Sequence, residues 1–106
     1  MASTIKVTLQ SIVNGNVTAG TDLNGVTVSV QNITDDNTSV VTKQWYGNEL
    51  TFDNLTPTKQ YTISVSSVNG YSQPTSYTTS ALGLGETVSQ TFQYEADSYT
   101  VSIDSD

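Results

Sequence analysis

Apolar and polar residues alternate along most of this chain. In residues 5–10, 26–31 and 61–66 every second side chain is aliphatic or aromatic, and polar residues fill the positions between. A period of two is typical of β-strands that bury one face. We therefore expect these stretches to be strands that line a common core.

Turn-forming residues separate these stretches at intervals of roughly 8 to 12 residues. Asn69-Gly70 is the strongest turn signal, and residues 15–20, which begin and end with glycine, are expected to form a loop. Segments 40–46 and 76–80 carry the weakest strand patterns, and the facing of 40–46 stays open. The expected strands are 5–10, 26–31, 40–46, 50–52, 61–66, 76–80, 88–94 and 99–103.

No stretch has the apolar period of a helix, so the fold class follows directly from the strands. The sequence predicts an all-β fold, an antiparallel Greek-key β-sandwich of seven or eight short strands, in a single domain spanning 1–106. Residues 99–103 leave two alternatives open, because they either close this sandwich or begin a following repeat. Their three apolar side chains on one face need a cover, which favours the closing strand.

The composition is poor in charge and rich in hydroxyl and amide side chains. Only 12% of the residues are charged, about half the usual share. The net charge is −7, with three lysines and no arginine, so nucleic acid and anionic membrane surfaces are poor partners. No run approaches the ~20 apolar residues of a membrane helix, and residues 1–4 do not have the pattern of a signal peptide. An exported parent protein would carry its signal elsewhere.

Residue types that carry common catalytic chemistry are missing. The chain has no histidine and no cysteine, which excludes Ser–His and Cys–His nucleophiles and the usual zinc sites. The one adjacent acidic pair, Asp35-Asp36, lies in an expected turn, so we predict no enzyme and no cofactor. Loop acids could gather at one end of the sandwich as a weak calcium site, but their spacing matches no calcium loop and we predict no metal. These acids are Asp22, Asp35, Asp36, Asp53 and Asp97.

Three aromatic residues lie beside expected turns. Trp45, Tyr46 and Tyr71 could stack on a sugar or anchor a protein partner. Core packing is the alternative, because the chain has only one Trp and two Phe to fill a core. The core is favoured for Trp45, and the choice stays open for the two tyrosines.

Several short motifs resemble those of known sandwich families. Asp22–Val28, with the sequence DLNGVTV, is similar to the second strand of prealbumin-like domains such as the Cna protein B-type and carboxypeptidase regulatory-like domains. Leu50–Leu55, Tyr61–Val65, Gly70-Tyr71 and Gly85–Thr87 follow in the family's order, so the likeness covers about two-thirds of the chain. The resemblance implies an immunoglobulin-like sandwich.

The fibronectin type III repeat is the rival resemblance. Leu55–Tyr61 is similar to its tyrosine corner, in which a buried tyrosine hydroxyl bonds to nearby backbone. However, residues 26–30 lack the tryptophan expected on the second strand, and some thirty residues follow Pro74, about where such a repeat would end. The prealbumin-like family is therefore preferred.

The Cna protein B-type resemblance also implies a Lys–Asn crosslink between strands, for which Lys6 is the candidate lysine. This chain has Val65 and Ser66 where the promoting acid is expected, and Gln93 and Glu95 but no asparagine on the acceptor strand. Alternation also directs Lys6 away from the core, where the amine would lose its proton. We predict no crosslink.

The resemblance implies a non-catalytic structural, spacer or adhesion module of a larger bacterial surface or phage virion protein. Its partners would be neighbouring domains of the same parent chain in a tandem arrangement, and the isolated domain would be a monomer. The alternative is a module that binds carbohydrate or a host surface protein through Trp45, Tyr46 and Tyr71. Either would be extracellular or on a virion, with no membrane insertion.

Overall fold

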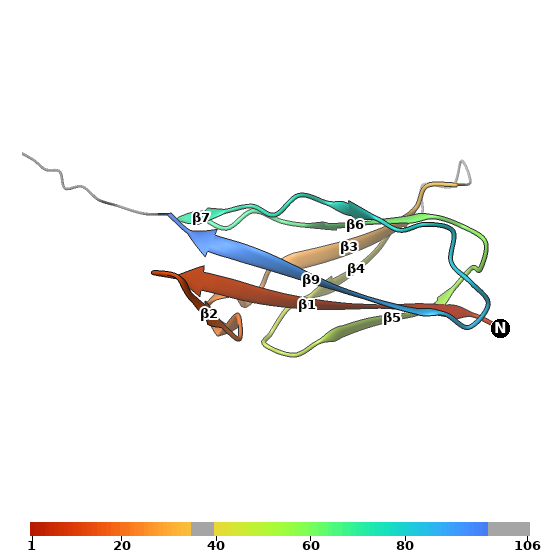
Figure 1. Ribbon diagram of the computed structural model, residues 1–106, viewed down its shortest axis with the longest axis horizontal. Coiled ribbons are helices and arrows are strands. Elements are labelled where there is room, and N and C mark those ends of the chain that lie inside the picture. The colour runs from red at the N-terminus through yellow and green to blue at the C-terminus, as the bar shows by residue number, and fades with distance from the viewer. Residues whose placement is uncertain (35–39, 98–106) are drawn as a thin grey trace, which may run out of the picture.

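Two β-sheets pack face to face in the computed structural model, which describes residues 1–34 and 40–97 (Figure 1). Within these described ranges one 3-10 turn, η1 (Thr21–Leu23), lies between the strands. The strands are β1 (Ser3–Val13), β2 (Asn16–Thr18), β3 (Thr27–Asn32), β4 (Val40–Gln44), β5 (Leu50–Leu55), β6 (Tyr61–Val65), β7 (Tyr71–Ser72), β8 (Tyr77–Thr78) and β9 (Thr87–Ala96). The predicted all-β sandwich is confirmed.

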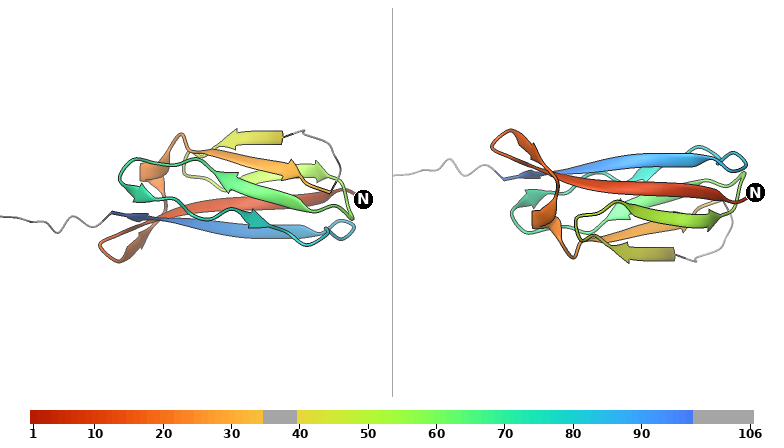
Figure 2. Two further views of the ribbon diagram at one scale, coloured as in Figure 1. Left: turned by 90° about the horizontal axis from the view of Figure 1, so that it is seen from above. Right: turned by 90° about the horizontal axis from the view of Figure 1, so that it is seen from below.

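The first sheet is built around β1. Strands β5 and β2 pair with successive parts of one edge of β1, β9 pairs along the other edge, and β7 pairs with the end of β9. The second sheet has the order β4-β3-β6-β8. Among the described pairings, β1 with β9 is parallel and the others are antiparallel, so the expected antiparallel sandwich contains one parallel ladder. Figure 2 shows β1 and β9 side by side over most of their length.

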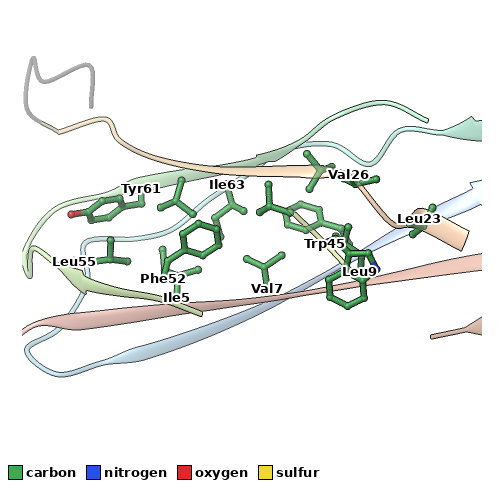
Figure 3. Close-up of a cluster of buried hydrophobic side chains, with 14 of the residues drawn as sticks. Ile5, Val7, Leu9, Leu23, Val26, Trp45, Phe52, Leu55, Tyr61 and Ile63 are labelled. Atoms are coloured by element: carbon green, nitrogen blue, oxygen red, sulfur yellow. The ribbon is translucent and has the colours of Figure 1, made fainter. Parts of the chain in front are cut away.

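The core lies between the sheets where the alternation placed it. Apolar side chains of β1, β3, β6 and β9 point inward, and the polar residues between them point outward. Figure 3 shows Trp45 and Phe52 within this cluster. The buried apolar residues are Ile5, Val7, Leu9, Leu23, Val26, Val28, Val30, Trp45, Phe52, Leu55, Tyr61, Ile63, Val65, Leu82, Phe92 and Tyr94.

The expected tyrosine corner is present at the start of β6. Tyr61 is buried, and its hydroxyl accepts a hydrogen bond of 2.9 Å from the backbone N–H of Thr56. The backbone N–H of Tyr61 in turn donates to the hydroxyl of the buried Thr79. The corner fixes the loop between β5 and β6.

Two short strands differ from the expectations. Residues 16–18, expected in a loop, form β2, because Asn14 and Gly15 both have positive φ and return the chain in a tight hairpin. The two-residue strand β7 was also not expected. Strand β4 is exposed along its whole length, and residues 35–39 and the expected strand 99–103 lie outside the described residues.

Candidate functional site

Figure 1 shows β2, β7 and the end of β9 at one end of the sandwich, and the turn η1 lies there because its Asp22 bonds Ser11 near the end of β1. Trp45 and Tyr46 follow β4, and Tyr71 begins β7. Two of the three aromatic candidates bond to the region of η1, since the indole N–H of Trp45 donates to Gly20 just before it and the hydroxyl of Tyr71 donates to Asp22 within it. We call this end the η1 end.

Trp45 belongs to the core, the interpretation that its sequence position favoured. Its side chain is 1% exposed, and its Nε1 donates to the carbonyl of Gly20 over 2.8 Å. Its backbone N–H donates to Val26 and its carbonyl accepts from Gly25. An indole ring buried to this extent has no exposed face that could stack on a sugar.

Tyr46 is the exposed member of the three. Its side chain is 62% exposed, and its hydroxyl donates to Oε1 of Gln44 over 2.8 Å. The neighbouring Gly47 lies close to the methyl group of Thr21, which places Tyr46 beside η1. Its ring is free to meet a partner.

Tyr71 and Asp22 form a hydrogen-bonded clasp across the η1 end. The hydroxyl of Tyr71 donates to Oδ2 of Asp22 over 2.5 Å, and the hydroxyl of Ser11 donates to Oδ1 over 2.7 Å. Ser11 also bonds the hydroxyl of Thr18. The clasp therefore joins β1, η1 and β7 through one carboxylate, and Ser11 extends it to β2.

The hydrogen bonds of the clasp shift the pKa values of both Asp22 and Tyr71. Partial desolvation opposes ionisation of Asp22, but hydrogen bonds from Tyr71, Ser11 and its own backbone N–H outweigh it and lower its pKa below the ordinary 3.8. The bond to Asp22, with some desolvation, raises the pKa of Tyr71 above 10.0. Asp22 is thus an ionised acceptor engaged by its neighbours, which is a structural use of an acid.

The acidic residues considered for calcium are spread over the molecule. Among residues 1–34 and 40–97, no three acidic side chains gather closely enough to hold a metal ion. Asp22 lies in η1, Asp53 in β5, and Asp97 follows β9. Asp35 and Asp36 lie outside the described residues. The described acids therefore offer no shared ligand set.

Lys6 points to the outer face of the first sheet, as the alternation indicated. It lies opposite Thr51 of β5 and Ser89 of β9 and is half-buried. Gln93, on the acceptor strand, is four positions further along β9, about 13 Å away, and donates to Gln10. The absence of a crosslink stays a prediction, and an intact mass lower by one ammonia, about 17 Da, would contradict it.

Lys43 is a feature that the sequence analysis missed. It lies opposite the buried Val28, so its side chain starts from the inner face of β4. Its Nζ donates to the carbonyl of Thr51 over 2.7 Å and lies 5.5 Å from the ring centre of Phe52. The side chain therefore bridges the open side between β4 and β5. Because side chains alternate along a strand, Lys43, two residues before the buried Trp45, could have been assigned to the inner face from the sequence.

The geometry defines an immunoglobulin-like β-sandwich domain whose η1 end is held by a hydrogen-bonded clasp. Its described residues include no helix long and apolar enough to cross a membrane. The buried Trp45 lies beneath that end, with Tyr46 exposed beside it.

Comparison with known proteins supports this class at the level of fold. No protein-family model matches the chain, and no curated protein matches it. The TIE protein of Bacillus anthracis has a similar structure, with 14% identity and a TM-score of 0.58 over 91% of this chain and 18% of that one. The C-terminal fragment of the pilus adhesin SpaC from Lactobacillus rhamnosus GG has 14% identity and a TM-score of 0.54, over 93% of this chain and 47% of that one.

These likenesses support the expected immunoglobulin-like β-sandwich fold. The chain spans less than half the length of either similar structure. At this level of identity the similarity concerns the fold, and the fold alone does not determine a function.

Proposed function

We propose that this protein is a non-catalytic structural module of a larger surface or virion protein, and that it transmits tension between neighbouring domains of the same parent chain. The observation that carries the proposal is the parallel pairing of β1 with β9. Because the first and last described strands run in the same direction, β1 starts at one end of the sandwich and β9 finishes at the other (Figure 1). Domains joined at these two ends lie in line.

The same pairing gives the module a way to resist being pulled. Nine successive residue pairs join β1 to β9, from Thr4 with Thr87 to Ile12 with Glu95. A pull on the two ends slides β1 along β9, so the hydrogen bonds of the ladder share the force. The start of β1 is also attached, since Ser3 donates to the carbonyl of Gly83 over 2.6 Å.

Composition and fold both support a structural role. The lack of histidine and cysteine removes the common nucleophile–base pairs. A fragment of a pilus adhesin is among the structures that share the fold, which supports a cell-surface setting for this module.

Single-molecule pulling tests the proposal. The chain has no cysteine, so a Thr87→Cys variant gives one unique attachment point beside the start of β1. Pulling between the two termini loads the β1–β9 ladder in shear, whereas pulling between the N-terminus and position 87 opens it one pair at a time. We expect a clearly higher unfolding force in the first geometry. Equal forces in the two geometries would refute the proposal, provided that Thr87→Cys retains the wild-type thermal transition.

A second candidate function is binding to a glycan or a host surface protein, and the exposure of Tyr46 favours it. Trp45 is enclosed and Tyr71 is bonded to Asp22, so Tyr46 would carry the contact. A glycan array probed with wild type and Tyr46→Ala tests this function. Binding that the variant loses would support it, and the absence of wild-type binding would leave the structural role as the better account.

A further inference from the structure

The outer edge of β9 carries backbone hydrogen-bonding groups that no described strand pairs with along most of its length, and the carbonyl of Thr91 accepts only a long bond of 3.4 Å from the side chain of Gln90. Within the described residues, β7 pairs with this edge only at Glu95 and Ala96. No other described strand pairs there, so the edge is open along residues 87–94. An open strand edge is a template for another strand.

The backbone groups on that edge follow from one hydrogen bond. Thr4 lies opposite Thr87, and its N–H donates to the carbonyl of Glu86 over 2.9 Å. In a parallel ladder alternate residues direct both backbone groups to the same neighbour. The even-numbered residues of β9 therefore face β1, which the bond from Asp97 N–H to Gly70 on the opposite side corroborates. The residues that face the open edge are Thr87, Ser89, Thr91 and Gln93.

The edge strands β4 and β9 differ in how they are protected against pairing with another chain. On β4, Lys43 starts from the inner face and reaches across to β5, and an inward charge of this kind discourages a further strand. Residues 87–94 contain no charged residue and no proline. In a chain of net charge −7, this uncharged edge is where a second copy meets the least repulsion.

The sequence of β9 also complements itself. In an antiparallel pair centred on Gln90, Val88 lies opposite Phe92 of the second copy, on the apolar side of the sheet. On the polar side Ser89 lies opposite Thr91. This register brings the open-edge backbone groups of the two copies face to face, because Ser89 and Thr91 both direct theirs outward.

We propose that β9 pairs antiparallel with β9 of a second copy of this chain, centred on Gln90, which joins two first sheets into one continuous sheet. The proposal does not depend on the tension-transmitting role. A single strand pair is small beside the about 1,600 Å² of a standard interface, so the dimer is weak and forms at high protein concentration. It would link neighbouring copies that are crowded on one surface.

Sedimentation velocity over a series of protein concentrations tests the proposal, with Thr91→Pro and Thr91→Val as a matched pair. Proline removes one open-edge N–H but leaves the β1 ladder intact, whereas valine keeps the N–H. We expect Thr91→Pro to weaken association by about tenfold or more and Thr91→Val to retain it. Circular dichroism establishes that both variants are folded.

A charge exchange provides a second test that does not require proline to be tolerated. Ser89→Lys with Thr91→Lys places like charges opposite each other in the dimer, and Ser89→Lys with Thr91→Glu places opposite charges there. We expect the first double variant to lose association and the second to keep or strengthen it. The first also brings the net charge nearer zero, so a general charge effect would act in the reverse direction.

Three results would overturn the proposal. The first is a chain that stays monomeric at every concentration, as expected for an isolated module. The second is equal association of the two charge variants. The third is loss of association when residues 98–106 are removed, because the occupant of the edge would then be that segment rather than β9 of a second copy.

Discussion

Trp45 owes its place in the core to a glycine 25 residues earlier in the chain. Gly20 has φ +79°, and its carbonyl accepts the indole N–H of Trp45. A Cβ at this position would lie 2.6 Å from the backbone oxygen of Leu9. The sequence marked Gly20 as the end of a loop, but the close approach to Leu9 is a long-range contact that no local pattern contains.

Gly20→Ala is expected to lower the free energy of unfolding by about 2–4 kcal/mol, from left-handed strain and the contact with Leu9. Urea unfolding followed by Trp45 fluorescence measures the loss. Gly15→Ala is the matched control, because Gly15 has φ +81° but nothing within 4 Å of an added Cβ. That variant should lose about 1–2 kcal/mol. Equal losses would show that the contact with Leu9 adds nothing.

Tyr94 ties the two sheets together. It projects from β9 in the first sheet, and its hydroxyl donates to the carbonyl of Ser66, which follows β6 in the second. Tyr94→Phe leaves that carbonyl without this donor, and we expect a loss of about 1–2 kcal/mol at neutral pH.

The same residue gives a dependence on alkaline pH. Desolvation raises the pKa of Tyr94 from 10.0 to about 12 in the folded protein. Above pH 10 the unfolded chain loses this proton first, so the contribution of Tyr94 is complete below pH 10 and is lost as the pH approaches 12. The stability gap between wild type and Tyr94→Phe should therefore narrow over this range in urea unfolding at successive pH values. A constant gap would contradict the assignment.

At the scale of elements, we expect Lys43 to protect the edge strand β4 from pairing with another chain. Val40 and Val41 of this strand are 46% and 48% exposed, so the strand already carries apolar surface. Lys43→Leu should keep the fold within about 1 kcal/mol, because only an exposed hydrogen bond and a cation–π contact are lost. It should also increase aggregation, measured by light scattering over time.

Thr42→Val is the control for this prediction. It makes the neighbouring position of β4 more apolar but leaves the charge of Lys43 in place, since Thr42 pairs with Ser29 on the outer face. Equal aggregation of the two variants would mean that apolar surface, rather than loss of the inward charge, is responsible.

Elements with a clear alternation could be predicted, and elements defined by distant partners could not. The strands around Ile5, Val28, Ile63 and Phe92 were expected because each buries one face. Strand β2 has exposed side chains throughout, so it carries no apolar signal, and its formation depends on the hairpin after β1. The parallel pairing of β9 with β1 was also missed, because alternation gives the face of a strand but not its neighbour.

The candidate site likewise combines one residue whose position could be predicted from the sequence with others whose positions could not. The core position of Trp45 was favoured from composition alone, since few large aromatics were available to fill a sandwich. The roles of Tyr46 and Tyr71 stayed open because their exposure depends on where η1 lies. The bond between Tyr71 and Asp22 joins residues 49 positions apart, and neither residue gives a local sign of the other.

At the scale of the whole molecule, the separation of Met1 from Asp97, the first and last described residues, limits how this domain can be rearranged. Many domains have neighbouring termini, which lets them be circularly permuted or inserted into a loop of another protein. Here a peptide joining Met1 to Asp97 would have to run the length of a nine-pair ladder, about 30 Å, or roughly ten extended residues. Permutants in which a linker of only a few residues replaces residues 98–106 should therefore fail to fold. A gene fusion can join this domain end to end with others, but inserting it into a loop of another protein requires long linkers.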